Sequence, residues 1–70
     1  MFTQEDIEIS RHAFIQASRR GITPDLIEKT LLTGKHVKFG KNYIKFVGKR
    51  IICVGEIKCM KVKILTIMLK

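Results

Sequence analysis

The sequence predicts a single α+β domain over residues 1–70, with two N-terminal helices packed on one face of a four-stranded antiparallel meander sheet. The main observation is a change of hydrophobic period at Gly34. Apolar residues recur every three or four positions before it and every second position after it, as in helices and strands respectively. The length supports one domain, because 70 residues form only one small core. The order α-α-β-β-β-β places both helices on the same face of the sheet.

The first helix is expected over residues 10–20. Ser10 is a suitable N-cap, because its hydroxyl can accept a hydrogen bond from a free amide of the first turn. Gly21 ends the helix, since glycine adopts the left-handed conformation that follows many helices without steric cost. A second helix that starts two residues later forms a helical hairpin or an L-shaped corner with the first.

The second helix is expected over residues 23–33. Thr23 is a good N-cap, and Pro24 fits the first helical position because the N–H that it lacks has no partner there. Asp25 in the first turn interacts favourably with the helix dipole. Gly34 closes the helix and begins the strand region.

Two strands are expected between residues 36 and 47, in the segments HVKF and NYIKFV. Successive side chains of a strand point to opposite faces of the sheet. In the first strand, the alternation puts Val37 and Phe39 on one face. His36 and Lys38 lie on the other face, which we expect to point outward. In the second strand, Ile44 and Phe46 point inward, and Tyr43 and Lys45 point outward.

Two further strands follow a tight turn at residues 48–49. The segment RIICVGEI is nearly all apolar, which is typical of a central strand. After a weaker turn at residues 58–59, the segment MKVKILTIML begins by alternating, with Lys61 and Lys63 outward. From Leu65 onward both faces of this last strand are apolar. That pattern indicates a β-bulge, a central position in the sheet, or coverage by a second chain.

Several classes of protein are disfavoured by composition. Cys53 and Cys59 are six residues apart without a histidine close behind, so they do not form a zinc site, which needs four ligands in short paired spacings. We therefore expect no metal and no cofactor. No basic, apolar leader and no apolar run of about 18 residues is present. Two reduced thiols and the lack of a membrane segment predict a cytoplasmic protein.

Positive charge is concentrated in the second half of the chain. Residues 1–34 contain four basic and five acidic residues, whereas residues 35–70 contain ten basic residues and one acidic residue. An asymmetry of this kind indicates an anionic partner, most commonly a nucleic acid. Nine of the ten cations are lysines, which favours diffuse attraction to phosphate over bidentate reading of bases. The alternative is a lysine-rich surface that only keeps the protein soluble.

The first helix carries a polar ridge, His12, Gln16 and Arg20, spaced four residues apart. The neighbouring ridge contains the small residues Ala13 and Ala17, which allow the helix to lie close to its support. The polar ridge is therefore expected at the rim of that contact, facing the edge of the sheet. His12 is either a structural residue of the first turn or a general acid or base, since histidine titrates near neutral pH. Arg20 either ties the helix corner to the sheet or neutralises a phosphate.

The motif S-x-H-A, followed by R-G-I, resembles a small prokaryotic family of unknown function with the signature I-S-x-H-A-x-x-R-x-x-x-R-G-I. That family is similar in layout to the RelE/barnase-like ribonucleases of toxin–antitoxin and polymorphic toxin systems. The resemblance covers residues 7–68, and His12 and Arg20 lie at motif positions. The chain departs from the signature at Gln16, where the family has its first arginine.

The resemblance implies metal-independent RNA cleavage, in which a base activates a ribose 2′-hydroxyl and an acid protonates the leaving oxygen. Only two histidines, His12 and His36, are available, and they can cooperate only if the first strand starts beside the first helix. The candidate catalytic residues are His12, Arg20 and His36, and the candidate RNA-binding residues are Lys38, Tyr43, Lys45, Lys61 and Lys63, with Thr66 as a further candidate.

Three functions are therefore compatible with the sequence. The first is a toxin-like RNA-binding protein that cleaves RNA or is related to proteins that do. The second is a non-catalytic module that binds RNA or an acidic protein such as an antitoxin. The third is a structural homodimer, formed through the last strand, whose basic face has no ligand.

Overall fold

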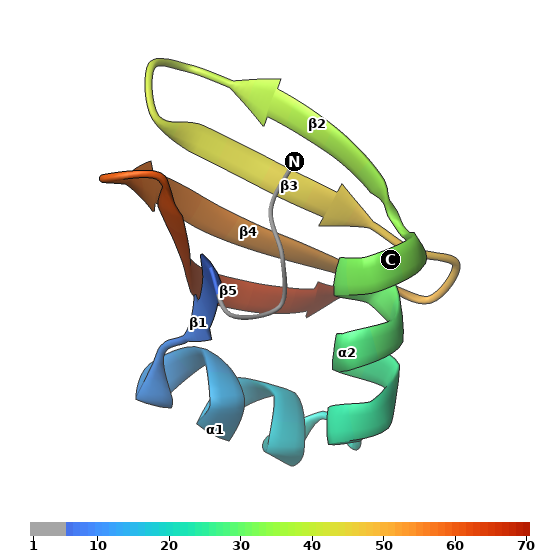
Figure 1. The fold of residues 1–70 in the computed structure, drawn as a ribbon. Coiled ribbons are helices and arrows are strands. Elements are labelled where there is room, and N and C mark those ends of the chain that lie inside the picture. The colour runs from blue at the N-terminus through green and yellow to red at the C-terminus, as the bar shows by residue number, and fades with distance from the viewer. Residues whose placement is uncertain (1–5) are drawn as a thin grey trace.

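The computed structural model describes residues 6–70 and contains two helices and five strands. The predicted α+β class is confirmed, but the sheet has five strands instead of four and is mixed instead of purely antiparallel. Figure 1 shows the two helices meeting in an L-shaped corner below and beside the sheet. The elements in chain order are β1 (Ile7–Ile9), α1 (Arg11–Arg19), α2 (Pro24–Thr33), β2 (Lys35–Phe39), β3 (Tyr43–Val47), β4 (Ile51–Lys58) and β5 (Lys61–Leu69).

Both helices begin and end where the sequence predicts. The Ser10 hydroxyl accepts a hydrogen bond from the Ala13 amide at 3.1 Å, which caps α1. The Thr23 hydroxyl accepts one from the Leu26 amide at 3.2 Å, which caps α2. Gly21, between the helices, has a φ of 74°, a conformation that glycine adopts without strain.

The strand that the sequence did not reveal is β1. It contains three residues and pairs in parallel with β5, with Ile7 opposite Val62 and Ile9 opposite Ile64. The Ser10 amide then donates to the Ile64 carbonyl at 2.9 Å before the chain turns into α1. Strands β2 to β5 form the predicted antiparallel meander, and the full order is β1-β5-β4-β3-β2.

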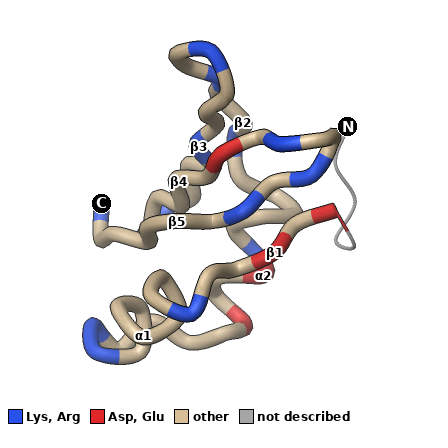
Figure 2. Tube along the Cα trace, turned by 90° about the vertical axis from the view of Figure 1, so that its left-hand side faces the viewer, with Lys and Arg blue, Asp and Glu red and all other residues tan. Residues whose placement is uncertain are grey.

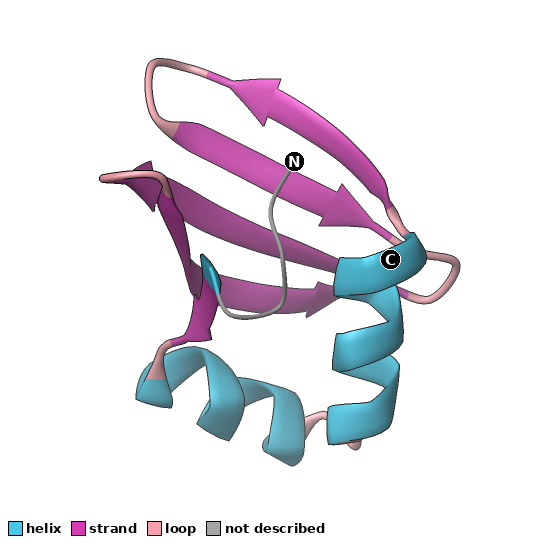
Figure 3. Cartoon of the chain, viewed as in Figure 1, coloured by secondary structure: helices cyan, strands magenta, loops and turns pink. Residues whose placement is uncertain are grey.

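The core lies between the two helices and one face of the sheet. Figure 3 shows the helices and strands as two separate groups. α1 packs on β5, and α2 packs on β3 and β4. Ala13 and Ala17 are the buried residues of α1, so the predicted close approach of this helix is confirmed. The remaining core residues are Ile22, Ile27, Leu31, Ile44, Phe46, Ile51, Cys53, Val62, Ile64 and Ile67.

A β-bulge explains the apolar end of the last strand. Val54 pairs with Thr66 and Gly55 pairs with Ile64, so Leu65 is the extra residue on β5. The bulge shifts the alternation by one residue and returns Ile67 to the core, where it is 0% exposed. The bulge was one of the three explanations that the sequence allowed.

The register of β2 corrects the expected placement of two candidate residues. His36 pairs with Phe46 and Lys38 pairs with Ile44, and paired residues of neighbouring strands share a face of the sheet. His36 and Lys38 therefore lie on the helix-covered side, whereas the sequence predicted that both point outward. The prediction failed because β2 is an edge strand in which four of the five residues are exposed. In such a strand the alternation of apolar and polar residues does not indicate which side faces the helices.

Candidate nucleic-acid interface

In the described part of the chain, one face of the sheet is left uncovered, because both helices pack on the other face. We call this uncovered side the open face. Strand alternation and register place on it five lysines and two glutamates, which are Lys35, Lys45, Lys58, Lys61, Lys63, Glu8 and Glu56. Figure 2 shows the basic residues distributed over the strands and turns of the sheet, with acidic residues sparse there. The excess of positive charge that the sequence locates after Gly34 therefore lies partly on one continuous surface.

An aromatic pair lies at one end of the open face. Phe39 and Tyr43 are directly opposite each other in the β2–β3 ladder. Their rings are stacked, with centroids 5.5 Å apart and planes inclined by 21°. Phe39 is 42% exposed and Tyr43 is 40% exposed, so the pair is a rigid apolar surface that solvent reaches. Gly40 in the adjoining turn has a φ of 61°, and a side chain at this position would lie against the Tyr43 ring.

Charged residues of both signs lie beside the aromatic pair on the open face, with Glu56 next to Tyr43 and lysines further along the strands. Tyr43 is opposite Glu56 on β4, and Glu56 is opposite Lys63 on β5. Lys45 follows two residues after Tyr43 on the same face and is half-buried among its neighbours. The candidates Tyr43, Lys45 and Lys63 are thus brought onto one surface. Lys61 and Thr66 lie on the same face. Lys61 is the first residue of β5. Thr66 and Lys45 lie in one cross-strand row, because both are paired with Val54.

The polar ridge of α1 places its three side chains in three different environments. His12 is exposed, and Gln16 is half-buried with its Oε1 buried and without a hydrogen-bond partner among the described residues. Arg20 donates from Nη1 to the main-chain carbonyl of Ile67 at 2.7 Å. Arg20 therefore ties the helix corner to β5, which is the structural alternative that the sequence left open.

His36 lies at the other edge of the sheet, where it is exposed and contacts residues of β3 and α2. Its ring contacts the ring of Phe46 edge-on, with centroids 4.7 Å apart. Its Nε2 lies 3.3 Å from the Leu31 carbonyl at the end of α2, and a hydrogen bond there requires that Nε2 carries the proton. β2 and β5 are separated by β3 and β4, about 14 Å at the usual strand spacing. The structure therefore does not bring His36 to His12, because α1 packs on β5.

The two thiols differ in environment. Cys53 is 0% exposed, and burial raises the pKa of its thiol from 9.0 to about 11, because the thiolate would lose its hydration. Cys59 is exposed in the β4–β5 turn. Among the described residues, no group of three or more His, Cys, Asp or Glu side chains is placed to hold a metal ion. Within residues 6–70, no helix has the length and apolar character needed to cross a bilayer.

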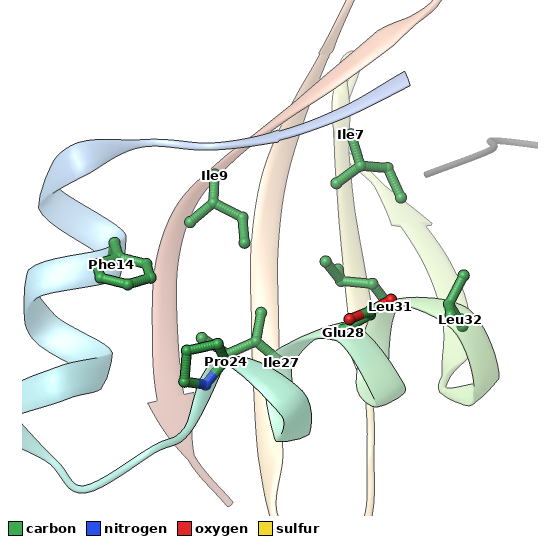
Figure 4. A pocket seen from close by; sticks show the side chains of 8 residues that line it. All are labelled: Ile7, Ile9, Phe14, Pro24, Ile27, Glu28, Leu31 and Leu32. Carbon is green, nitrogen blue, oxygen red and sulfur yellow. The ribbon is translucent and has the colours of Figure 1, made fainter. Parts of the chain in front are cut away.

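An apolar cavity of about 230 Å³ lies on the helix side, between β1 and the two helices. Figure 4 shows the side chains of Ile7 and Ile9 on one side of it and those of α2 on the other. The carboxylate of Glu28 is the charged group among its lining residues. This cavity is remote from the open face and contains none of the predicted site residues.

Phe39 is the residue of this interface that sequence reasoning missed. It precedes the Gly40 turn, and Tyr43 follows that turn. An aromatic residue on each side of a three-residue hairpin loop is a signal that would have found the pair.

No protein-family model matches the chain, and the searches of curated proteins and of solved structures also gave no match.

Proposed function

We propose that this protein binds single-stranded RNA on the open face of its sheet. The observation that carries the proposal is the stacked, solvent-accessible pair Phe39 and Tyr43 on the same face as five lysines. Aromatic side chains on an uncovered sheet stack with unpaired bases, and nearby cations attract the phosphates that connect those bases.

The arrangement favours unpaired over double-stranded RNA. In a duplex the base faces are stacked on each other and cannot reach an aromatic side chain, whereas a single strand can present them. Each base–aromatic stack contributes about 1–3 kcal/mol. Lysine contacts to phosphate add affinity that depends on salt but not on sequence. Weak sequence preference is therefore expected.

The resemblance to toxin ribonucleases would add RNA cleavage to this binding function. Cleavage needs a base and an acid within hydrogen-bond reach of one phosphate and ribose. The His36 ring contacts the Phe46 ring and the Leu31 carbonyl, and Arg20 donates a hydrogen bond to the Ile67 carbonyl. His12 is the remaining candidate base, because it is exposed at the start of α1. We therefore propose RNA binding without RNA cleavage.

An acidic protein partner, such as an antitoxin, would use the same lysines but would not require the aromatic pair. A structural dimer with an incidental basic face would bind no nucleic acid at moderate salt.

Incubation with a mixed pool of single-stranded RNA at two salt concentrations, beside the His12→Ala variant, separates these functions. We expect binding that weakens as salt rises, in both proteins, with the RNA left intact. Shortened RNA that requires His12 would instead establish the ribonuclease.

A further inference from the structure

A second strongly basic feature lies at the other end of the sheet from the aromatic pair. It is a groove of about 890 Å³ between the C-terminal half of α2, the start of β2 and the β3–β4 turn. Among residues 6–70, none of the residues that line it is acidic or aromatic. The five cations that line it, which we call the cationic groove, are Lys29, Lys35, Lys49, Arg50 and Lys70.

Stabilisation of the α2 C-terminus does not account for this cluster. Cations near the end of a helix interact with its free carbonyls, but two carbonyls of the last turn already have donors within the chain. Thr33 donates its hydroxyl to the Lys29 carbonyl at 2.7 Å, and the Gly34 amide donates to the Thr30 carbonyl at 2.8 Å. Lys49 and Arg50 belong to a turn between strands, so they are not part of the helix.

The backbone fixes the positions of the cations from the turn and the last strand. The Gly48 amide donates to the Ile51 carbonyl at 2.9 Å, which closes the β3–β4 turn. The Lys70 amide donates to the Arg50 carbonyl at 2.9 Å, which holds the end of β5 beside that turn. A side chain on Gly48 would meet Thr30, which is itself 4% exposed. The groove wall is therefore close-packed beneath its charges.

Cations that line the same groove repel each other and create a field that attracts an anion. The Lys70 ammonium donates from Nζ to the Gly48 carbonyl at 3.4 Å, which is a weak hydrogen bond. A ligand with several negative charges would relieve the repulsion. Because none of the described residues that line the groove is aromatic, it suits a phosphate backbone instead of a stacked base.

We infer that the cationic groove binds the phosphates of the same RNA strand that stacks on Phe39 and Tyr43. This inference rests on the proposed function. Lys35 connects the two sites, because it lines the groove and also lies on the open face opposite Val47. The five residues of β3 separate the sites by about 16 Å, at 3.3 Å per residue. The bound strand therefore runs along β2 and β3, and a strand too short to span them contacts only one site.

The test is the affinity of two unstructured RNAs, a trinucleotide and a dodecanucleotide of uridine, measured by fluorescence anisotropy over a range of salt. The groove variant is Lys49→Gln with Arg50→Gln. The control is Arg11→Gln with Arg19→Gln on α1, since both variants lower the formal net charge of +8 by two. A variant in which Phe39 and Tyr43 are both replaced by leucine reports on the open face.

We expect the groove variant to lose about tenfold in affinity for the dodecanucleotide, with a salt slope about 1.4 units shallower, at 0.7 for each lost phosphate contact of a single strand. Its affinity for the trinucleotide should equal that of the control. If the groove variant and the control bind the dodecanucleotide alike, while the leucine variant is impaired, the groove inference is wrong and the open-face proposal stands. If the unmodified protein binds neither RNA, both are wrong.

Discussion

The guanidinium of Arg20 donates a hydrogen bond to the main-chain carbonyl of Ile67 over 2.7 Å, across 47 positions of sequence. This bond joins the corner between the helices to the free edge of β5. β1 pairs with β5 only from Val62 to Ile64, so in the described part of the chain Arg20 takes the place of a neighbouring strand at Ile67. Arg20 thereby stabilises the fold and also blocks an edge that could pair with another chain.

Replacement of Arg20 by alanine should lower the free energy of unfolding by about 1 kcal/mol, because it removes a charge-assisted hydrogen bond at a partly exposed site. In a domain of this size, that loss corresponds to a fall in Tm of about 4–8 °C. Thermal unfolding followed by circular dichroism measures it. Arg19→Ala, at an exposed position of the same helix, is the matched control and should change Tm much less. Equal effects from the two substitutions would show that the Ile67 contact contributes nothing specific.

The same substitution should increase self-association. Leu65, Met68 and Leu69 on β5 are 36%, 37% and 59% exposed, and removal of Arg20 leaves the Ile67 carbonyl free to pair with a second strand. Sedimentation velocity across a concentration series should show more dimer for Arg20→Ala than for the unmodified protein. An unmodified protein that is already fully dimeric at low concentration would instead support the homodimer through the last strand.

Gln16→Met should stabilise the protein by about 1 kcal/mol. The Oε1 of Gln16 is buried and lacks a hydrogen-bond partner among the described residues, and an unsatisfied buried acceptor carries a cost that an apolar side chain of similar shape avoids. Chemical denaturation with urea measures the change as a higher midpoint at a constant slope. A midpoint that stays the same or falls would mean that the Gln16 amide is better solvated than its burial indicates.

Burial of Cys53 predicts a loss of stability in alkaline solution. Its thiol has a pKa of about 11 in the folded protein against 9.0 when exposed, so the folded state retains a proton that the unfolded state releases. The stabilisation is fully present below pH 9, falls as the pH rises, and levels off above the folded pKa. The loss amounts to roughly 2–3 kcal/mol, at 1.36 kcal/mol per pKa unit.

The comparison with Cys53→Ala isolates this contribution, because lysines and Tyr43 titrate in the same range in both proteins. The difference in unfolding free energy between the two proteins should narrow between pH 9 and pH 11 as the unmodified protein loses stability. A difference that stays constant across that range would contradict the raised pKa of Cys53.

In the folded protein a thiol reagent should modify the exposed Cys59 and leave Cys53 unmodified.

The β4–β5 turn is a site where substitution should stabilise. Cys59 and Met60 have φ values of 52° and 64°, the conformation of a two-residue hairpin turn that Asn-Gly occupies with least strain. Cys59→Asn combined with Met60→Gly should raise the unfolding free energy by about 1 kcal/mol. Calorimetry provides the measurement. A lower Tm would mean that Met60, which is 85% exposed, contributes contacts that outweigh the strain.

Local signals predicted most of the fold. The caps at Ser10 and Thr23 lie where the sequence places them, since capping depends on residues three positions apart. β1 could not be predicted in the same way. Its three residues are too few to show a period, and its pairing with β5 joins positions about 55 residues apart in sequence. Parallel pairing of that kind depends on the completed fold.

The candidate site was predicted in part, for a related reason. Alternation places Tyr43, Lys45, Lys61 and Lys63 on the outward face, and the structure has them there. Alternation does not say which side of an edge strand is covered, because that is decided by the register with β3. His36 and Lys38 were misplaced, and Phe39 was missed, for this reason. The cationic groove gathers residues from α2, β2, a turn and the chain end, which no local pattern relates.

The most direct test of the proposed function is RNA binding by a variant that lacks both rings of the aromatic pair, Phe39→Leu with Tyr43→Leu. Phe14→Leu is the matched control, because Phe14 is an exposed aromatic residue, 47% accessible, on α1. Leucine preserves apolar bulk and leaves every lysine in place. We predict an affinity for single-stranded RNA at least about fivefold lower for the double variant, from the loss of one or two base stacks of about 1–3 kcal/mol each. The salt dependence and the Tm should match those of the control. Undiminished affinity in the double variant, with the unmodified protein binding RNA, would contradict base stacking on the open face.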